Sequence, residues 1–224
     1  MMSWNKGEFL AYIWCDSQEI IGEKWDEFER KQWNNCKIKE KLDKFYQIIE
    51  EKGFKICDEF SMNDTYFIPQ NLNLDKMTTR EILSKAILVR EIEDKTFGKM
   101  IKKITFKIKN FDENGSILNQ ESINCDVLDI EDAKNLLRAI GYQEIMCIRE
   151  DDVVYKNGQL ELAIKDVKNG DKLIEVETEE SEELNTIDKL IRKVNELDIP
   201  IYTDNYFVKK AEIELDKVLK DGRR

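Results

Sequence analysis

Residues 27–31 form an ExExK sequence, in which three charged side chains recur at every second position. On a β-strand alternate side chains point to the same face, so Glu27, Glu29 and Lys31 would share one face. Two carboxylates beside an ammonium group could hold a divalent cation next to a phosphate, because hard cations prefer oxygen ligands. The segment also fits a helix, since apolar residues from Ile21 onward are spaced as one helical face. The spacing leaves both structures open.

The composition excludes several other kinds of catalytic site. The chain of 224 residues contains no histidine, which excludes Ser-His-Asp and Cys-His nucleophiles and HExxH zinc sites. It contains only nine glycines, and they form neither a GxGxxG nor a GxxxxGK[ST] sequence, so a Rossmann or P-loop phosphate site is excluded. The net charge of −11 argues against general nucleic-acid binding, which needs a basic surface.

The same composition predicts a cytoplasmic protein. Hydrophobic residues make up 41% of the chain and charged residues 37%, and no apolar run approaches the ~20 residues that span a bilayer. The five cysteines lie far apart without a CxxC pair, which favours reduced thiols over disulfides or zinc. We expect no membrane partner, and a homodimer is left open.

Two segments of the chain share one plan. Leu42 begins a helical stripe of apolar residues that Gly53 ends, and a strand-like run follows. Asp129 can cap a second such helix, which Gly141 ends before another strand-like run. We interpret the two segments as a duplicated half of one sheet, with chance similarity as the alternative.

The strands predicted between and after these helices carry charged side chains on one face. Clear examples are 87–92, 103–109, 160–167 and 172–178, and two further helices are expected near the C-terminus. We predict an α+β fold, a closed or nearly closed antiparallel barrel of about eight strands with a polar lumen and helices outside. The chain contains no Gly-, Ser- or Pro-rich linker, so residues 23–224 are predicted as one domain and 1–22 as an appendage.

The ordered motifs resemble the CYTH, or triphosphate tunnel metalloenzyme, superfamily, which includes class IV adenylyl cyclases and thiamine triphosphatases. Its N-terminal signature is similar to the ExExK sequence described above. Further segments resemble its later motifs over roughly residues 25–208: Asp64-Thr65-Tyr66-Phe67, Ile87-Leu88-Val89-Arg90, Thr105-Phe106-Lys107, Gln120-Glu121, Gly141-Tyr142 with Tyr155, and Glu175-Val176-Glu177.

The chain also departs from this pattern. Glu150 and Asp152 stand where the family has a Lys-x-Arg pair, and Lys165 stands where it has an aspartate. These changes fit a rewired ligand site, an alignment that slips, or lost catalysis. A competing register places the first strand at Asn35–Lys39 and would remove ExExK from it.

The resemblance implies a metal-dependent site for a triphosphate. It implies Glu29 and Lys31 as catalytic residues, and Lys31, Arg90, Lys107 and Lys103 as contacts to the substrate. It implies Glu27, Glu29, Glu121, Glu175 and Glu177 as ligands of Mg²⁺ or Mn²⁺. The expected activity is hydrolysis or cyclisation of a small molecule such as a nucleoside triphosphate, thiamine triphosphate or tripolyphosphate. The alternative is a catalytically degenerate module that binds a nucleotide, a polyanion or a protein partner.

Overall fold

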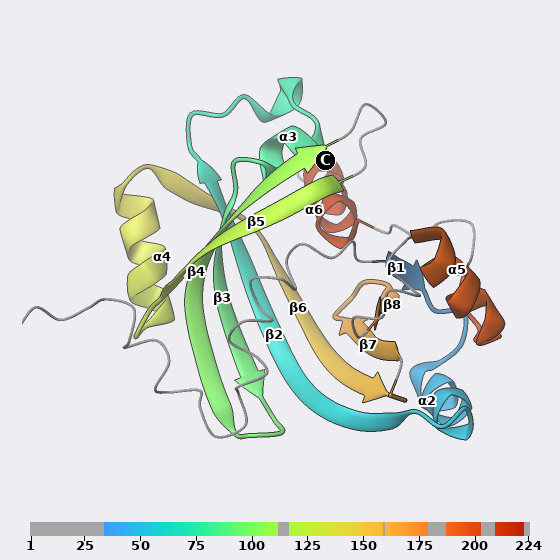
Figure 1. Cartoon of the computed structure of the whole chain (residues 1–224). Coiled ribbons are helices and arrows are strands. Elements are labelled where there is room, and N and C mark those ends of the chain that lie inside the picture. Colours follow the sequence, from blue (N-terminus) through green and yellow to red (C-terminus); the bar gives the residue numbers. More distant parts are fainter. Residues whose placement is uncertain (1–33, 112–116, 159, 179–186, 203–208, 222–224) are drawn as a thin grey trace, which may run out of the picture. The chain divides into compact units, whose positions relative to one another are not determined.

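The computed structural model describes residues 34–111, 117–158, 160–178, 187–202 and 209–221 (Figure 1). The chain divides into two compact units. The larger unit contains Trp33–Lys107 and Ile123–Arg224, and the smaller contains Ile108–Ser122 with Met1–Gln32. The domain boundary predicted after residue 22 lies outside the described residues and stays a prediction. None of the described helices is both long enough and apolar enough to span a membrane.

Eight strands form one antiparallel sheet in the order β1-β8-β7-β6-β2-β3-β4-β5. Their bounds are β1 Asn34–Lys37, β2 Lys55–Pro69, β3 Ile87–Asp94, β4 Lys99–Phe111, β5 Ile117–Asp126, β6 Tyr142–Lys156, β7 Leu160–Val167 and β8 Lys172–Thr178. Number, direction and flanking helices agree with the predicted α+β fold. Closure into a barrel does not, because β1 and β5 are the sheet's two edges and no pairing joins them within the described ranges.

The helices are α2 Leu42–Glu51, α3 Thr79–Leu83, α4 Ile130–Ala139, α5 Ile187–Glu196 and α6 Lys210–Asp221, with a short 3₁₀ turn at Leu74–Lys76. As predicted, the Asp129 side chain caps α4 by accepting hydrogen bonds from two backbone N–H groups. Gly53 and Gly141 follow α2 and α4 with φ of 86° and 90°, a conformation that favours glycine.

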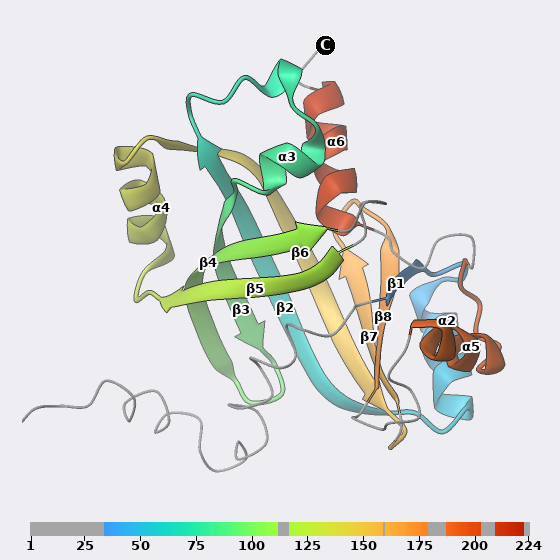
Figure 2. The ribbon, with the colours of Figure 1, turned by 45° about the horizontal axis from the view of Figure 1, so that its top comes forward.

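The duplicated plan is visible in the sheet. After α2 the chain forms the meander β2-β3-β4, and after α4 it forms β6-β7-β8. The two meanders meet where β2 pairs with β6, the longest ladder of the sheet, and Figure 2 shows these strands side by side. The sheet is therefore built from two similar halves joined at its centre.

The helices cover both faces of the sheet in the larger unit. On one face, Phe45 and Ile49 of α2 and Val194 of α5 pack with apolar residues of β1, β7 and β8. On the same face, Ala133 and Leu137 of α4 pack against residues of β2 and β3. On the other face, buried residues of α3 and α6 cover an apolar cluster made of Tyr66, Leu88, Met146, Ile148, Val167 and Leu173.

The first described strand follows the competing register. β1 begins at Asn34 and pairs with β8, so that Asn35 lies opposite Glu175. The ExExK sequence precedes it and lies outside the described residues. The catalytic residues Glu29 and Lys31 and the metal ligand Glu27 therefore stay predictions.

Candidate functional site

The face covered at one end by α3 and α6 carries a row of ionisable side chains. Register aligns Asp64 of β2 with Arg90 of β3, and Arg90 with Lys103 of β4. Residues directly opposite in an antiparallel pair point to the same side, so these three share one face. The same reasoning across β6, β7 and β8 adds four acidic or basic residues: Glu150, Asp152, Lys165 and Glu175. We call these residues, with Lys107 and Lys210, the charged face.

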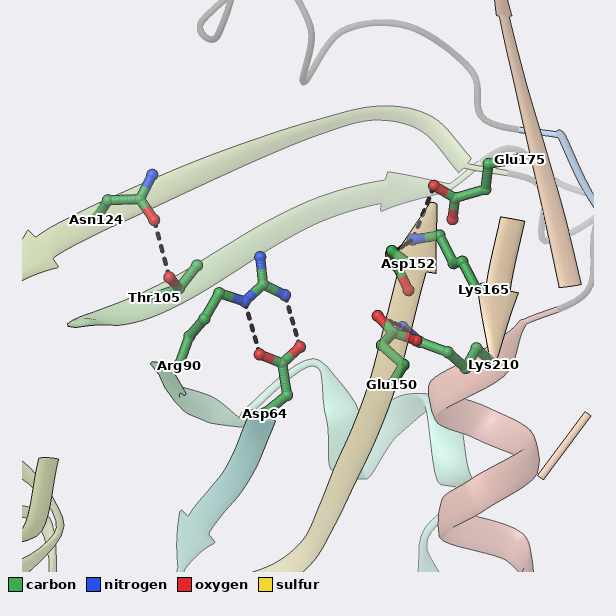
Figure 3. Close-up of polar contacts among 9 residues, drawn as sticks. All are labelled: Asp64, Arg90, Thr105, Asn124, Glu150, Asp152, Lys165, Glu175 and Lys210. Atoms are coloured by element: carbon green, nitrogen blue, oxygen red, sulfur yellow. Dashed lines mark hydrogen bonds and ion pairs between the residues drawn. The ribbon is translucent and has the colours of Figure 1, made fainter. Parts of the chain in front are cut away.

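Asp64 and Arg90 form a bidentate ion pair at the centre of the charged face (Figure 3). The Arg90 Nε and Nη2 atoms each lie 2.6 Å from an Asp64 carboxylate oxygen. Burial alone would raise the pKa of Asp64, but the Arg90 charge and hydrogen bonds outweigh burial and lower it. Asp64 is thus an ionised carboxylate that orients Arg90.

Glu150 and Lys210 form a second bidentate contact. The Lys210 Nζ atom lies 2.6 Å from each Glu150 carboxylate oxygen. The Glu150 side chain is 1% exposed and that of Lys210 is 17% exposed. Lys210 is the first residue of α6, so this helix contributes a cation to a face otherwise built from strands.

Asp152, Lys165 and Glu175 form a third group. The Lys165 Nζ atom lies 3.0 Å from a Glu175 oxygen and 3.7 Å from an Asp152 oxygen. The Asp152 side chain is fully buried, and neither of its oxygens accepts a hydrogen bond from the described residues. Burial raises the pKa of Asp152 to about 7, since desolvation and the nearby Glu150 charge outweigh Lys165.

Burial and the neighbouring charges also shift the pKa of Lys165 in this group. Burial alone would lower the pKa of Lys165, but the charges of Glu175 and Asp152 outweigh it and raise the pKa. Lys165 therefore carries a positive charge at neutral pH. On β4 and β5, near Arg90 in Figure 3, the Thr105 hydroxyl donates a hydrogen bond of 2.8 Å to Asn124.

The structure brings together some of the predicted site residues. Arg90, Lys103 and Glu175 lie on the charged face, and Lys107 shares the side of β4 that carries Lys103. Arg90 holds Asp64, and Glu175 holds Lys165. The ligand contacts predicted for these residues stay predictions.

The predicted metal ligands are not assembled by the described residues. The side chain of Glu177 lies outside the described part, and Glu121 is an exposed residue of the smaller unit. Within the described ranges, no group of three or more aspartate, glutamate, cysteine or histidine side chains could hold a metal ion.

Sequence reasoning missed Lys210 and the partner role of Asp64. Lys210 had no motif around it, and its helix was expected only from the apolar spacing of Ala211, Leu215 and Val218. The pairing of Asp64 with Arg90 depends on the register between β2 and β3, which no residue pattern specifies. Lys165 was noted as a departure, and the cross-strand register to Asp152 explains it.

Comparison with known proteins gives one sequence match and several structural ones. No protein-family model matches the chain. Over 183 residues the chain is 27% identical to a protein of Methanocaldococcus jannaschii named "Putative adenylate cyclase MJ0240", covering 80% of this chain and 95% of that one. This match spans nearly the whole length of the relative.

Two solved structures share the fold. PH1819 of Pyrococcus horikoshii superimposes with a TM-score of 0.57 at 18% identity, covering 86% of this chain and 100% of that one. A Vibrio parahaemolyticus protein described as a "putative adenylate cyclase" superimposes with a TM-score of 0.51 at 11% identity. The match covers 86% of this chain and 98% of that one. At these identities the structural matches show a common fold.

Proposed function

We propose, from the confirmed similarity of this chain to the CYTH superfamily, that its charged face binds a triphosphate-containing small molecule and hydrolyses or cyclises it. The Methanocaldococcus jannaschii relative, by its name, would act on a nucleoside triphosphate. The proposed substrates are a nucleoside triphosphate, in line with that name, or thiamine triphosphate or tripolyphosphate, in line with the motif resemblance.

The observation that supports the proposal is the row of cations on β3 and β4. Arg90 and Lys103 lie directly opposite each other, and Lys107 follows on the same side of β4. Half-buried cations on adjacent strands can contact successive phosphate groups, because charge-assisted hydrogen bonds to phosphate oxygens are strong. Asp64 holds the Arg90 guanidinium in position, so this cation is oriented before the ligand arrives.

The described carboxylates of the charged face do not assemble a metal site. Mg²⁺ or Mn²⁺ needs several oxygen ligands, and the described carboxylates Asp64, Glu150 and Glu175 are each held by a cation. The described residues therefore do not fit a metal cage. Mg²⁺ or Mn²⁺ is expected from Glu27 and Glu29, which lie outside the described residues.

A second candidate function is binding without turnover. Glu150 and Asp152 stand where the family has basic residues, and both are buried against Lys210 and Lys165. An anionic ligand would have to compete with these carboxylates for the two lysines. This observation favours a module that binds a nucleotide or another polyanion and leaves it unchanged.

The deciding experiment measures binding and turnover separately. Calorimetry with tripolyphosphate, with and without Mg²⁺ or Mn²⁺, reports binding. Phosphate release from ATP, GTP, thiamine triphosphate and tripolyphosphate, with cyclic nucleotide followed in parallel, reports turnover. Binding with turnover supports the enzyme, and binding alone supports the module. If none of these compounds binds, both candidates are wrong.

Lys107→Ala tests directly whether the row of cations on β3 and β4 binds the ligand. Removal of a charge-assisted contact is expected to weaken tripolyphosphate binding by about 1.5–3 kcal/mol. The matched control is Lys102→Ala, which removes a lysine from the opposite side of β4. We expect the control to bind as the unaltered chain does. Equal affinities for the two variants in calorimetry would remove Lys107 from the site.

A further inference from the structure

The helix α6 places the one lysine of the charged face that does not come from a strand. Lys210 begins α6, and its Nζ atom contacts both oxygens of Glu150. An ammonium group has three N–H donors, and two of them suffice for these contacts. Among the described residues Lys210 makes no further hydrogen bond, so its third donor could serve a ligand on the charged face.

The position of Lys210 is fixed by the packing of α6. Leu215, one helical turn further along, is fully buried in the apolar cluster with Tyr66 and Leu88. Arg80 of α3 also contacts Glu212 of α6, at 3.3 Å. Both figures of the ribbon show α3 and α6 side by side. The packing of Leu215 and the Arg80–Glu212 ion pair hold the first turns of α6. The position of Lys210 next to Glu150 is therefore fixed by the fold.

The charge of Lys210 reaches both neighbouring groups of the charged face. It lowers the pKa of Asp64 on β2, and it opposes the rise in the pKa of Asp152 on β6. Figure 3 shows Lys210 reaching from α6 to Glu150, which lies beside Asp152 on β6. The ammonium group thus lies close to the centre of the cluster of charges.

Glu150 acts as the internal counter-ion of this lysine. A glutamate that is 1% exposed is costly to bury without a cation, and Lys210 satisfies both its oxygens. An anionic ligand would share or take over this cation. Glu150 would then set how strongly the ligand must bind in order to compete.

We propose that Lys210 is a ligand-contact residue that meets a phosphate group, and that Glu150 tunes this contact by competing for the lysine. The inference rests on the proposed function and goes further, because it assigns a phosphate contact to the C-terminal helix and a restraining role to a carboxylate. Position 150 thereby sets the affinity for phosphate without carrying a cation itself.

The test uses calorimetric titration of the full-length chain with tripolyphosphate. Lys210→Met should weaken binding by about tenfold or more, the loss expected for a charge-assisted contact. Glu150→Gln keeps the shape of the side chain and should tighten binding several-fold, because the lysine no longer has a charged competitor. Lys217→Met is the matched control, since Lys217 lies on the exposed side of the same helix and pairs with Glu214.

A double variant keeps the test decisive if Lys210→Met alone disturbs folding. Glu150→Gln with Lys210→Met removes both charges of this pair together, so neither is left buried without the other, and thermal unfolding checks that the variant is folded. It should bind tripolyphosphate about tenfold more weakly than Glu150→Gln alone. Equal affinity for these two variants overturns the proposal for Lys210.

The outcomes separate this inference from the proposed function. Loss of binding on Lys107→Ala with no effect of Lys210→Met would keep the function and reject the inference. An unaltered chain that binds no tripolyphosphate would reject both. Weakening by Lys210→Met and not by Lys217→Met supports the inference.

Discussion

At the scale of single residues, the charged face contains four carboxylates and five cations, of which Asp64, Glu150, Asp152 and Lys165 are buried. Asp64, Glu150 and Glu175 each contact a lysine or an arginine. Asp152 differs, since the Lys165 Nζ atom lies 3.7 Å from it and donates no hydrogen bond to it. The same Nζ atom lies closer to Glu175, at 3.0 Å. Replacing any one of these charges should therefore affect its neighbours, because contacting groups in one network are not additive.

Asp152 should make stability depend on pH. Its folded-state pKa of about 7 lies above the unfolded value near 3.8, so the folded chain binds the extra proton between these limits. Its contribution to stability is complete below about pH 4 and is lost as the pH rises through about 7. Asp152→Asn cannot ionise, so the stability of this variant relative to the unaltered chain should rise from pH 4.5 to pH 7.5.

Urea unfolding at several pH values measures this difference. The charged groups around Asp152 are Glu150, Lys165, Glu175 and Lys210, and they are present in both proteins. Glu161→Gln is the control, since this half-buried glutamate of β7 pairs with Lys156 away from the cluster. A difference between the unaltered chain and Asp152→Asn that stays constant with pH would contradict the assignment.

At the scale of elements, every described helix except α3 was expected from the sequence. The apolar spacing from Leu42 and the capping residue Asp129 gave the positions of α2 and α4, because helix ends and periodicity are local properties. The strands β7 and β8 were predicted at Leu160–Val167 and Lys172–Thr178, the bounds that the structure shows. Local pattern was sufficient for these four elements.

The register between elements could not be predicted in the same way. The pairing of Arg90 with Asp64 and the approach of Lys210 to Glu150 both join residues far apart in the chain. No local property of Lys210 distinguishes it from Lys209 beside it. The position of the first strand could not be predicted from local pattern either, since both ExExK and Asn35–Lys39 alternate. The first described strand, β1, overlaps Asn35–Lys39.

The anchoring of α6 gives a prediction at this scale. Leu215→Ala should lower the free energy of unfolding by about 2–5 kcal/mol, because a fully buried leucine leaves a cavity in the apolar cluster. It should also weaken tripolyphosphate binding, since Lys210 depends on the position of this helix. Val218→Ala, on the exposed side of α6, is the control. Calorimetry and urea unfolding measure both effects.

If Leu215→Ala lowers stability without changing affinity, Lys210 reaches the ligand independently of the helix anchor. If neither quantity changes, the packing of α6 described above is wrong. The two measurements therefore test the position of the helix separately from the role of its lysine.

At the scale of the whole molecule, the charge arrangement differs from the family pattern at a pair of neighbouring strands. Asp152 of β6 lies directly opposite Lys165 of β7, where the family places a basic and an acidic residue respectively. Such an exchange keeps a cross-strand pair of opposite charges and moves the cation to the adjacent strand. We propose a rewired ligand site rather than a slipped alignment or lost catalysis, and the variant described next tests this proposal.

Restoring the family pair tests this interpretation. Glu150→Lys with Asp152→Arg would place two more cations beside Lys165 and Lys210 in a buried region, so we expect the melting temperature to fall. A polyanion should relieve this repulsion, so tripolyphosphate should raise the melting temperature of the variant more than that of the unaltered chain. Thermal unfolding with and without tripolyphosphate measures both effects.

Sodium sulfate at matched ionic strength is the control for non-specific screening. An equal response of both proteins to tripolyphosphate would show that positions 150 and 152 do not face the ligand. A variant as stable as the unaltered chain would show that the cations at 165 and 210 can move away.

The pairing of β2 with β6, which we call the seam of the two meanders, also has a consequence for how the chain folds. Each meander pairs neighbouring strands, but the seam joins residues such as Ser61 and Asp151, which are 90 positions apart. Long-range pairing must overcome the entropy of closing a large loop, so it forms slowly and late. Each half can therefore assemble soon after it leaves the ribosome, whereas the charged face, which takes residues from both halves, is completed only when the second half docks.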